Sequence, residues 1–358
     1  MANYAKKANK SLLALFAIII LIAGGLFLFS RQRNVTASGA DKQIIRLAHN
    51  QSSDHPTHIG MLAFEEFIES KYGDQYDVQI YPSELLGTQT NLVQLTQTGA
   101  IEVTVASNSI LETFNTDFQI FNLPYLFESP EAYHAAMDDP EIVASIFNGT
   151  TDSGFVTKAW LDAGTRNFYV KDTPINEVSD LAGKKIRVQQ SPTNVSMMNL
   201  LGGSATPMGF GDVYTAIQSG VIDGAENNEL ALTENGHGDV VKNYSYTMHQ
   251  MIPDEVIVST RFLDALPENE QATFDEAFKI MEETQHQAWE EKVAEARDRA
   301  ENDMNVVFNY PDIEPFKEAV LPLHDAMLEA YPELQDTYNK IQEKNENYTN
   351  NTREGDAS

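Results

Sequence analysis

Apolar and polar residues alternate in blocks through the first part of the chain. Residues 44–48 form a short apolar run typical of a buried strand, and residues 58–72 carry apolar side chains at helical spacing. Further strands are predicted at residues 78–81 and 101–106, with a helix at residues 90–99 between them. This alternation predicts an α/β unit with a mostly parallel sheet.

A second alternation of the same kind begins near Thr157. Residues 185–188 form an apolar strand after Gly183, residues 212–219 have helical spacing, and residues 221–225 form a strand that ends in a polar turn. The chain is therefore predicted to contain two α/β units, and the loops at the ends of their strands can carry a ligand site.

The C-terminal third is predicted to be helical. Residues 267–304 are highly charged, and their apolar residues recur at helical spacing, which predicts one unusually long helix that could bridge both units. Residues 315–344 add further helix, interrupted at Pro322 and Pro332. Residues 346–358 are polar and are predicted to be a disordered tail.

The first 40 residues have the pattern of an export signal. Lys6, Lys7 and Lys10 precede an uncharged apolar run at residues 11–30. Small residues at 38–40 offer a cleavage site, but the run is also long enough to remain as a signal anchor, so both outcomes stay open. In either case the rest of the chain is expected outside the cytoplasmic membrane.

Charge and cysteine content exclude several classes of function. The chain has 53 Asp and Glu against 24 Lys and Arg, a formal net charge of -29, and a surface this acidic repels nucleic acid. It has no cysteine, which excludes disulfides, lipoprotein anchors and thiolate metal sites. An anionic ligand would need local positive groups to overcome the field of the whole chain.

Two arginines are the strongest candidates for such groups. Arg187 lies between Ile186 and Val188 in an apolar strand, and burial there requires a partner anion. That anion is either one of the many acidic side chains or a ligand carboxylate held by the guanidinium fork. Arg166 lies at the boundary between the first and the second predicted unit. It is either a residue of the ligand cleft or one partner of a salt bridge at the hinge.

The other candidate site residues can equally have purely structural roles. The polar run at residues 223–228 can supply a cleft with hydrogen-bonding groups or be a simple turn, and Phe210 can line a ligand or belong to the core. The spacing of His49, His55 and His58 fits no zinc motif, and no nucleophile elbow, phosphate loop or dinucleotide motif is present. We therefore expect neither an enzyme nor a metal or cofactor site.

Seven short motifs occur in one order along the chain, at residues 47–50, 86–87, 122–127, 164–167, 181–188, 206–214 and 221–227. In this combination the chain resembles the DctP-type solute-binding subunits of TRAP (tripartite ATP-independent periplasmic) transporters. The resemblance implies an α/β, two-lobed periplasmic-binding-protein (flytrap) fold with a long helix spanning both lobes. It also implies delivery of the solute to a sodium-driven permease in the membrane.

The resemblance also implies lobe boundaries and site residues. Lobe I would comprise residues 41–163 and about 253–292, and lobe II residues 164–252 and about 293–345. Arg187 matches the arginine that pairs with the solute carboxylate, and the other implied site residues are Arg166, Asn227, Phe210, Asn50 and Ser107.

The solute is expected to be a small organic acid bound by a monomer. Ser107 replaces a glutamate of the sialic-acid branch, and residues 50–56 look more like branches that take sugar acids such as uronates or aldonates. A C4-dicarboxylate or another carboxylate, and a receptor that serves a membrane sensor kinase, remain alternatives. The alternative from another class of protein is a secreted enzyme, a hydrolase or lyase.

Overall fold

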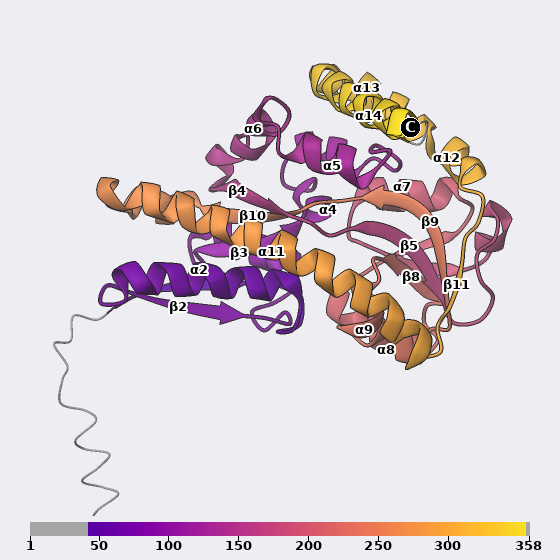
Figure 1. The fold of residues 1–358 in the computed structure, drawn as a ribbon, viewed down its shortest axis with the longest axis horizontal. Helices are drawn as coiled ribbons and strands as arrows, with labels where there is room; N and C mark the ends of the chain where they lie inside the picture. Colours follow the sequence, from indigo (N-terminus) through magenta and orange to yellow (C-terminus); the bar gives the residue numbers. More distant parts are fainter. Residues whose placement is uncertain (1–41, 356–358) are drawn as a thin grey trace, which may run out of the picture. The chain divides into compact units, whose positions relative to one another are not determined.

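The computed structural model describes residues 42–355, and the chain from Ile44 onward forms one compact unit (Figure 1). The export segment expected at residues 1–40 lies outside the described part. Among the described helices, none has the length and apolar character needed to cross a bilayer.

The first lobe is built on a five-stranded sheet in the order β2-β1-β3-β10-β4. Strands β1 and β3 are parallel, as the alternation predicts, whereas β10 runs antiparallel to both β3 and β4. The sheet is therefore mixed, because β10 enters it directly from the other lobe. The strands are β1 (Gln43–Ala48), β2 (Tyr76–Tyr81), β3 (Val103–Ser107), β4 (Phe155–Leu161) and β10 (Asp254–Ser259).

The second lobe is built on a six-stranded sheet in the order β11-β9-β5-β8-β6-β7. Strand β5 is antiparallel to β8 and β9, and β6 is parallel to β7 and β8. The chain crosses between the sheets three times, from β4 to β5, from β9 to β10 and from β10 to β11, which makes the two-lobed fold. The strands are β5 (Thr165–Val170), β6 (Lys185–Val188), β7 (Ser204–Pro207), β8 (Gly224–Asn227), β9 (Asn243–Met251) and β11 (Val307–Asn309).

One predicted strand lies further along the chain than its apolar residues suggest. The apolar pair at residues 221–222 precedes β8, and Val221 is 57% exposed. The strand is instead Gly224–Asn227, part of the polar run expected to form a turn. Polar side chains can occupy this buried strand because they have partners there, such as Arg166 for Glu226.

Helices cover both sheets, and several begin at a capping side chain followed by proline. Ser129, Asp139 and Ser191 each accept a hydrogen bond from a backbone N–H of the helix they precede. The α-helices before the long one are α2 (Pro56–Tyr72), α3 (Gln89–Thr98), α4 (Asn108–Leu111), α5 (Pro130–Met137), α6 (Pro140–Asn148), α7 (Pro192–Leu200), α8 (Val213–Gln218), α9 (Leu230–Thr233) and α10 (Thr260–Ala265). Short 3₁₀ turns are η1 (Thr116–Asn122), η2 (Thr151–Ser153), η3 (Val178–Leu181), η4 (Phe210–Asp212), η5 (His237–Asp239) and η6 (Pro332–Leu334).

The long helix of the prediction is α11 (Glu268–Asn302), with 35 residues. It packs on α2 in the first lobe and on α9 in the second, and therefore spans both lobes (Figure 1). The contact with α2 is close, because a Cβ at Gly60 would lie 2.7 Å from the Met281 carbonyl oxygen.

The C-terminal helices follow the predicted interruptions but end elsewhere. They are α12 (Glu314–Val320), α13 (Pro322–Ala330) and α14 (Gln335–Gly355), so helix covers most of the segment expected to be disordered. The sequence also assigned residues up to 345 to the second lobe. Helix α14 packs on α5 and α6 of the first lobe instead, because Ile341 joins its core and Asn345 Nδ2 donates to the Leu126 carbonyl at 2.9 Å.

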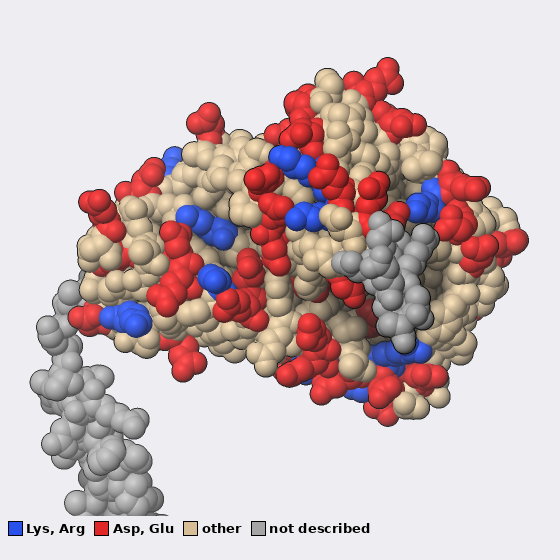
Figure 2. Space-filling model, turned by 45° about the horizontal axis from the view of Figure 1, so that its top comes forward, with Lys and Arg blue, Asp and Glu red and all other residues tan. Residues whose placement is uncertain are grey.

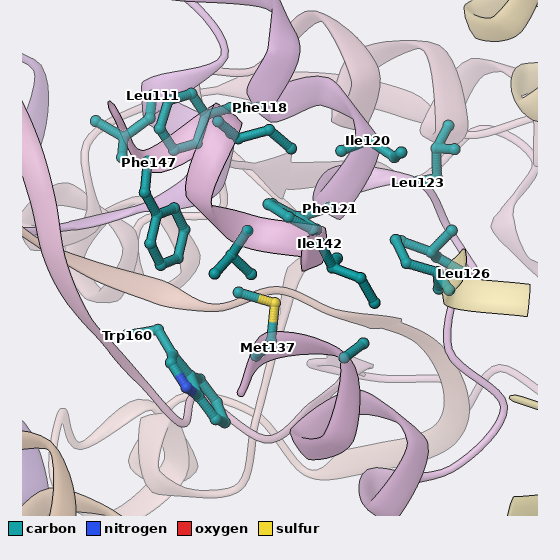
Figure 3. Packing of buried hydrophobic residues seen from close by; sticks show 14 of the residues in the cluster. Leu111, Phe118, Ile120, Phe121, Leu123, Leu126, Met137, Ile142, Phe147 and Trp160 are labelled. Atoms are coloured by element: carbon teal, nitrogen blue, oxygen red, sulfur yellow. The ribbon is translucent and has the colours of Figure 1, made fainter. Parts of the chain in front are cut away.

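Separate apolar cores support the two lobes. In the first lobe, rings of Phe118, Phe121, Phe147 and Trp160 pack with aliphatic side chains around Met137 (Figure 3). In the second lobe, apolar clusters lie around Phe168 and Tyr169 of β5. Outside these cores the surface is strongly acidic, with few basic side chains on the face drawn in Figure 2.

Candidate functional site

A pocket with about 500 Å³ of empty space lies between the lobes. Five of the six residues expected at a solute site line it: Asn50, Arg166, Arg187, Phe210 and Asn227. These side chains come from segments that are far apart in the sequence, and the crossings of the chain between the sheets bring them together.

Three neighbouring strands of the second sheet supply the polar floor of the pocket. Arg166 comes from β5, Asn227 from β8 and Arg187 from β6, which are consecutive in the sheet order β5-β8-β6. The register pairs Arg187 with Ala225 of β8. Because these strands are hydrogen-bonded neighbours, the two guanidinium groups are held on one rigid surface.

Arg166 is fully engaged by the protein itself. Its Nε donates to Glu226 Oε2 at 2.6 Å, Nη2 donates to Glu226 Oε1 at 3.1 Å, and Nη1 donates to Asn227 Oδ1 at 2.9 Å. Burial acts to lower the pKa of Arg166, but the Glu226 carboxylate raises it overall. This salt bridge joins β5 to β8 within the second sheet, so it does not span the hinge, and Arg166 also lines the pocket.

Glu226 is ionised although it is completely buried. Burial acts to raise its pKa, yet Arg166 and His249 hold the pKa at about 2. His249 Nε2 lies 3.6 Å from Glu226 Oε2, and the His249 ring stacks on Phe168. Burial lowers the pKa of His249, so the imidazole is neutral at pH 7 and acts as a polar neighbour of the ion pair.

Arg187 has no such anionic partner. Its Nε and Nη2 both donate to the Met208 carbonyl, at 3.2 and 2.9 Å, and its guanidinium lies 5.5 Å from the centre of the Phe210 ring. Within the described residues it forms no ion pair, although it is only 4% exposed. Burial therefore lowers its pKa. A buried guanidinium in this state is a site for an anion.

Phe210 serves both the pocket and the core behind it. Its ring lies 5.3 Å from the His237 ring, and His237 Nδ1 is 2.8 Å from the Tyr169 hydroxyl. Burial lowers the pKa of His237 to about 3, so this imidazole is neutral. The wall beside Arg187 is consequently apolar and rigid.

The opposite side of the pocket is rich in hydrogen-bond acceptors. Asn50 Oδ1, Gln51 Oε1 and Glu84 Oε1 are buried and have no hydrogen-bond partner among the described residues. Asp254 also lines the pocket, and burial raises its pKa to about 6. Gln51 belongs to the stretch 50–56 that resembles sugar-acid branches, whereas sequence patterns did not single out Glu84 or Asp254, since nothing distinguishes them from the many other acidic residues.

Ser107 is near the site but is not among the residues that line it. It ends β3, pairs with Asp254 of β10 and hydrogen-bonds the Asp254 side chain. Its backbone N–H donates to Gln89 Oε1, at 3.4 Å, and Gln89 does line the pocket. Ser107 thus contacts the pocket through its two neighbours.

The three clustered histidines support the loop that carries Asn50 and Gln51. His49 Nδ1 accepts from the Gln51 backbone N–H at 3.2 Å, which places its proton on Nε2, 3.0 Å from His58 Nδ1. His55 is the N-cap of α2 and accepts from Thr57 N–H. Residues 42–348 contain no group of three or more side chains arranged to hold a metal ion.

Polar contacts join the two lobes around the pocket. The Gly211 N–H donates to Glu84 Oε2 at 3.3 Å across the cleft. Deeper in, the buried Glu112 carboxylate accepts from the Ser191 hydroxyl at 2.7 Å and from the Thr193 N–H at 3.1 Å, at the start of α7. These contacts change whenever the lobes move apart.

Comparisons with known proteins agree with this geometry. Residues 47–331 match the family model for DctP, described as "Bacterial extracellular solute-binding protein, family 7". The uncharacterized protein YiiZ of Salmonella typhimurium is 40% identical over 299 residues, which cover 84% of this chain and 91% of that protein.

Solved structures of TRAP periplasmic solute-binding proteins also match. One from Anaerococcus prevotii, with bound α/β-D-glucuronate, is 60% identical with a TM-score of 0.85, over 86% of this chain and 99% of that chain. One from Sulfitobacter, with bound β-D-galacturonate, is 31% identical with a TM-score of 0.80, over 84% of this chain and 100% of that chain.

Proposed function

Because the chain belongs to the bacterial extracellular solute-binding proteins of family 7, we propose that it is the receptor for a uronate that a TRAP permease carries across the membrane. Proteins of this family are solute receptors, which points to a binding protein and not to an enzyme. The observation that carries the proposal is Arg187, a buried guanidinium without an anion, in a pocket whose other side offers acceptors.

The two sides of the pocket fit the two ends of a sugar acid. The solute carboxylate binds Arg187, next to Asn227 and the engaged Arg166. The ring hydroxyls then donate to Asn50, Gln51, Glu84 and Asp254, whose oxygen atoms accept hydrogen bonds. Phe210 packs against the carbon frame of the solute.

The same arrangement disfavours a C4-dicarboxylate. Such a solute carries a second negative charge, and the far side of the pocket holds the carboxyl groups of Glu84 and Asp254. Repulsion between the second carboxylate of the solute and these carboxyl groups is costly, because the closed pocket excludes the water that would screen it. The solved relatives support a uronate too, since those from Anaerococcus prevotii and Sulfitobacter hold glucuronate and galacturonate.

Closure of the lobes completes the site. In the open protein Arg187 meets the carboxylate first, and the first lobe then brings Asn50 and Glu84 over the solute and excludes water. The Glu84–Gly211 and Glu112–Ser191 contacts stabilise the closed form. The solute drives closure only by its higher affinity for that form.

Delivery to a sodium-driven permease is the role we propose for the closed receptor, outside the cytoplasmic membrane and as a monomer. A sensor kinase is the alternative recipient. Deleting the gene for this protein should abolish uronate uptake in cells that otherwise take it up. Normal uptake with loss of uronate-induced gene expression would instead identify a sensor pathway.

The binding test is calorimetry with D-glucuronate, D-galacturonate, D-gluconate and succinate, followed by mass analysis of the recovered solute. We expect a uronate to bind most tightly and to be recovered unchanged. Arg187→Lys should weaken binding by about 30-fold or more, since a desolvated charge pair contributes roughly 2 to 5 kcal/mol.

Arg261→Lys is the matched control, because Arg261 is exposed and, like Arg187, donates to a backbone carbonyl, here that of Thr98 at 2.8 Å. An Arg187→Lys protein that binds within about threefold of the parent would refute the role of the guanidinium. Tighter binding of succinate than of either uronate would refute the solute class.

A further inference from the structure

A second and larger hollow lies at the hinge, with about 1180 Å³ of empty space. We call it the hinge groove, and Tyr133, Thr165, Asn167, Tyr246, Met248 and Trp289 are among the residues that line it. These side chains come from α5 of the first lobe, from β5 and β9 of the second and from α11. The groove is therefore walled by both lobes and by the helix that spans them.

The hinge groove and the solute pocket lie back to back on the same strand. In a β-strand, successive side chains point to opposite faces. Arg166 of β5 lines the solute pocket, whereas its neighbours Thr165 and Asn167 line the hinge groove. The two hollows are also adjacent just after β8, because Asn227 and Asn228 line the pocket and Glu229 lines the groove.

The walls of the groove are aromatic and flexible. Tyr246 and Trp289 contribute rings, and Met248 and Met251 contribute thioethers, a combination found at adaptable binding surfaces. Met248 is 43% exposed and has a positive φ of 49°. Its backbone N–H is held by Asn167 Oδ1 at 2.8 Å, where the pairing of β9 with β5 is irregular. This strained turn keeps an apolar side chain at the groove.

Three acidic side chains and one histidine line the groove. Asp162, Glu229 and Glu290 line it, against His134, which pairs with Asp162 at 2.7 Å. Arg297 lies outside, 5.8 Å from the centre of the Tyr246 ring, and donates to the Tyr310 hydroxyl. The Tyr133 hydroxyl is buried and has no hydrogen-bond partner among the described residues, although Tyr133 lines the groove.

We propose that the hinge groove binds an ammonium or guanidinium group on an apolar stem, and that its occupancy favours closure of the lobes on the solute. Aromatic faces attract cations, and the attraction is strongest where water is excluded. The carboxylate of Glu290 supplies the countercharge, and the Tyr133 hydroxyl supplies an acceptor. The methionines and Val293 accommodate the stem.

Coupling to the solute follows from the back-to-back placement. A rotation about the strands that cross between the lobes brings the walls of one hollow together as it moves those of the other apart. An occupant that fills the hinge groove therefore opposes opening of the solute cleft. By thermodynamic reciprocity, the solute must increase the affinity of the groove for its occupant by the same factor.

The cation could be a free organic amine or a lysine or arginine side chain of a membrane partner. Phenethylammonium is the probe for the first source, with 2-phenylethanol as its neutral counterpart. The peptide acetyl-Leu-Lys-Leu-amide probes the second, with norleucine in place of lysine as control. Each is titrated into the protein by calorimetry, and quenching of Trp289 in a Trp160→Phe variant reports whether the probe enters the groove.

We expect at least one cationic probe to bind about tenfold more tightly than its neutral control. Glu290→Gln should remove this preference, whereas Glu291→Gln, at an exposed residue that does not line the groove, should keep it. Binding of the amine alone assigns a free cation, and binding of the peptide alone assigns a partner side chain. Equal binding of cationic and neutral probes, or equal behaviour of the two variants, would overturn the proposal.

The coupling is measured separately, by titrating D-glucuronate with and without a saturating cationic probe. We expect an increase in uronate affinity of about fivefold, and an unchanged affinity would overturn the coupling. The groove titrations contain no sugar acid, so their outcome does not depend on the proposed function.

Discussion

Replacing Arg187 by glutamine should leave the ligand-free protein as stable as the parent, or more stable, while it removes solute binding. The reason is that Arg187 is buried and forms no salt bridge in the described residues. Glu226 and Glu84 favour its charge only from a greater distance, so the charge is compensated only in part until the solute arrives. A glutamine at this position has similar polarity but no charge. The substitution therefore removes a burial penalty from the free protein and an ion pair from the complex.

The structure sets the approximate sizes of both effects. An uncompensated buried charge typically destabilises a protein by about 3 to 5 kcal/mol. Against this, the variant loses the two hydrogen bonds from Arg187 to the Met208 carbonyl, which contribute about 1 kcal/mol each. The ligand-free variant should thus be about 1 to 3 kcal/mol more stable, whereas its complex loses roughly 2 to 5 kcal/mol of binding.

The assay is urea unfolding followed by circular dichroism, with and without D-glucuronate at 100 times its dissociation constant for the parent. The solute should raise the free energy of unfolding of the parent by about 2.7 kcal/mol and that of Arg187→Gln by less than about 1 kcal/mol. Arg261→Gln, which removes an exposed arginine, is the control and should respond as the parent does. A ligand-free Arg187→Gln protein destabilised by about 3 kcal/mol or more would show that the charge is already compensated and would refute the reasoning.

The remaining predictions concern the ion pair, the acceptor side and the hinge. Glu226→Gln leaves a buried guanidinium without its anion and should reduce the free energy of unfolding by about 3 to 5 kcal/mol in urea; a loss below about 1 kcal/mol would contradict the pairing. Asp254 has a pKa of about 6, above its value of about 3.9 when unfolded, so the folded protein binds the extra proton between these values. Its contribution to stability should therefore fall as the pH rises from about 4 to 6 and then stay constant. The measurement is the free energy of unfolding in urea at pH 4.5 and at pH 7, for the parent and for Asp254→Asn. The loss of stability between these pH values should be smaller in Asp254→Asn, and an equal loss in both proteins would show that Asp254 does not titrate in this range. Gly164→Ala should destabilise by more than about 1 kcal/mol, because φ is 62° and the new Cβ would lie 2.7 Å from the Trp289 ring. Gly183→Ala, with φ of 79° and open space around it, gives the backbone effect alone, so equal losses in the two variants would refute the steric part.

The sequence was most informative where a residue contradicts its surroundings. An arginine between Ile186 and Val188 in an acidic chain demands an explanation, and the flanking motifs supplied one. The structure places Arg187 in the pocket with Arg166, Asn227, Phe210 and Asn50. Strand β6 and helix α11 were predicted almost to the residue, because a short run of β-branched residues after a glycine and a long helical periodicity are local properties.

Features that depend on contacts between residues far apart in the sequence could not be predicted from local sequence patterns. Glu84 and Asp254 are two acidic residues among 53, and only the meeting of the lobes makes them part of the pocket. Strand β8 was predicted too early in the chain, at the apolar pair of exposed Val221 and buried Ile222, because its own polar residues are stabilised by partners distant in sequence. The helix beyond residue 345 was missed because α14 is held by its packing on α5 and α6.

The contrast between the acidic surface in Figure 2 and the buried guanidinium of Arg187, which forms no ion pair in the described residues, has a kinetic consequence. An anionic solute approaches against a repulsive long-range field, which salt screens over about 8 Å at physiological ionic strength. Once it is enclosed with the guanidinium, salt has little access to the pair. The association rate should therefore rise with salt concentration while the dissociation rate stays nearly constant, so that this receptor captures its solute best in a saline medium.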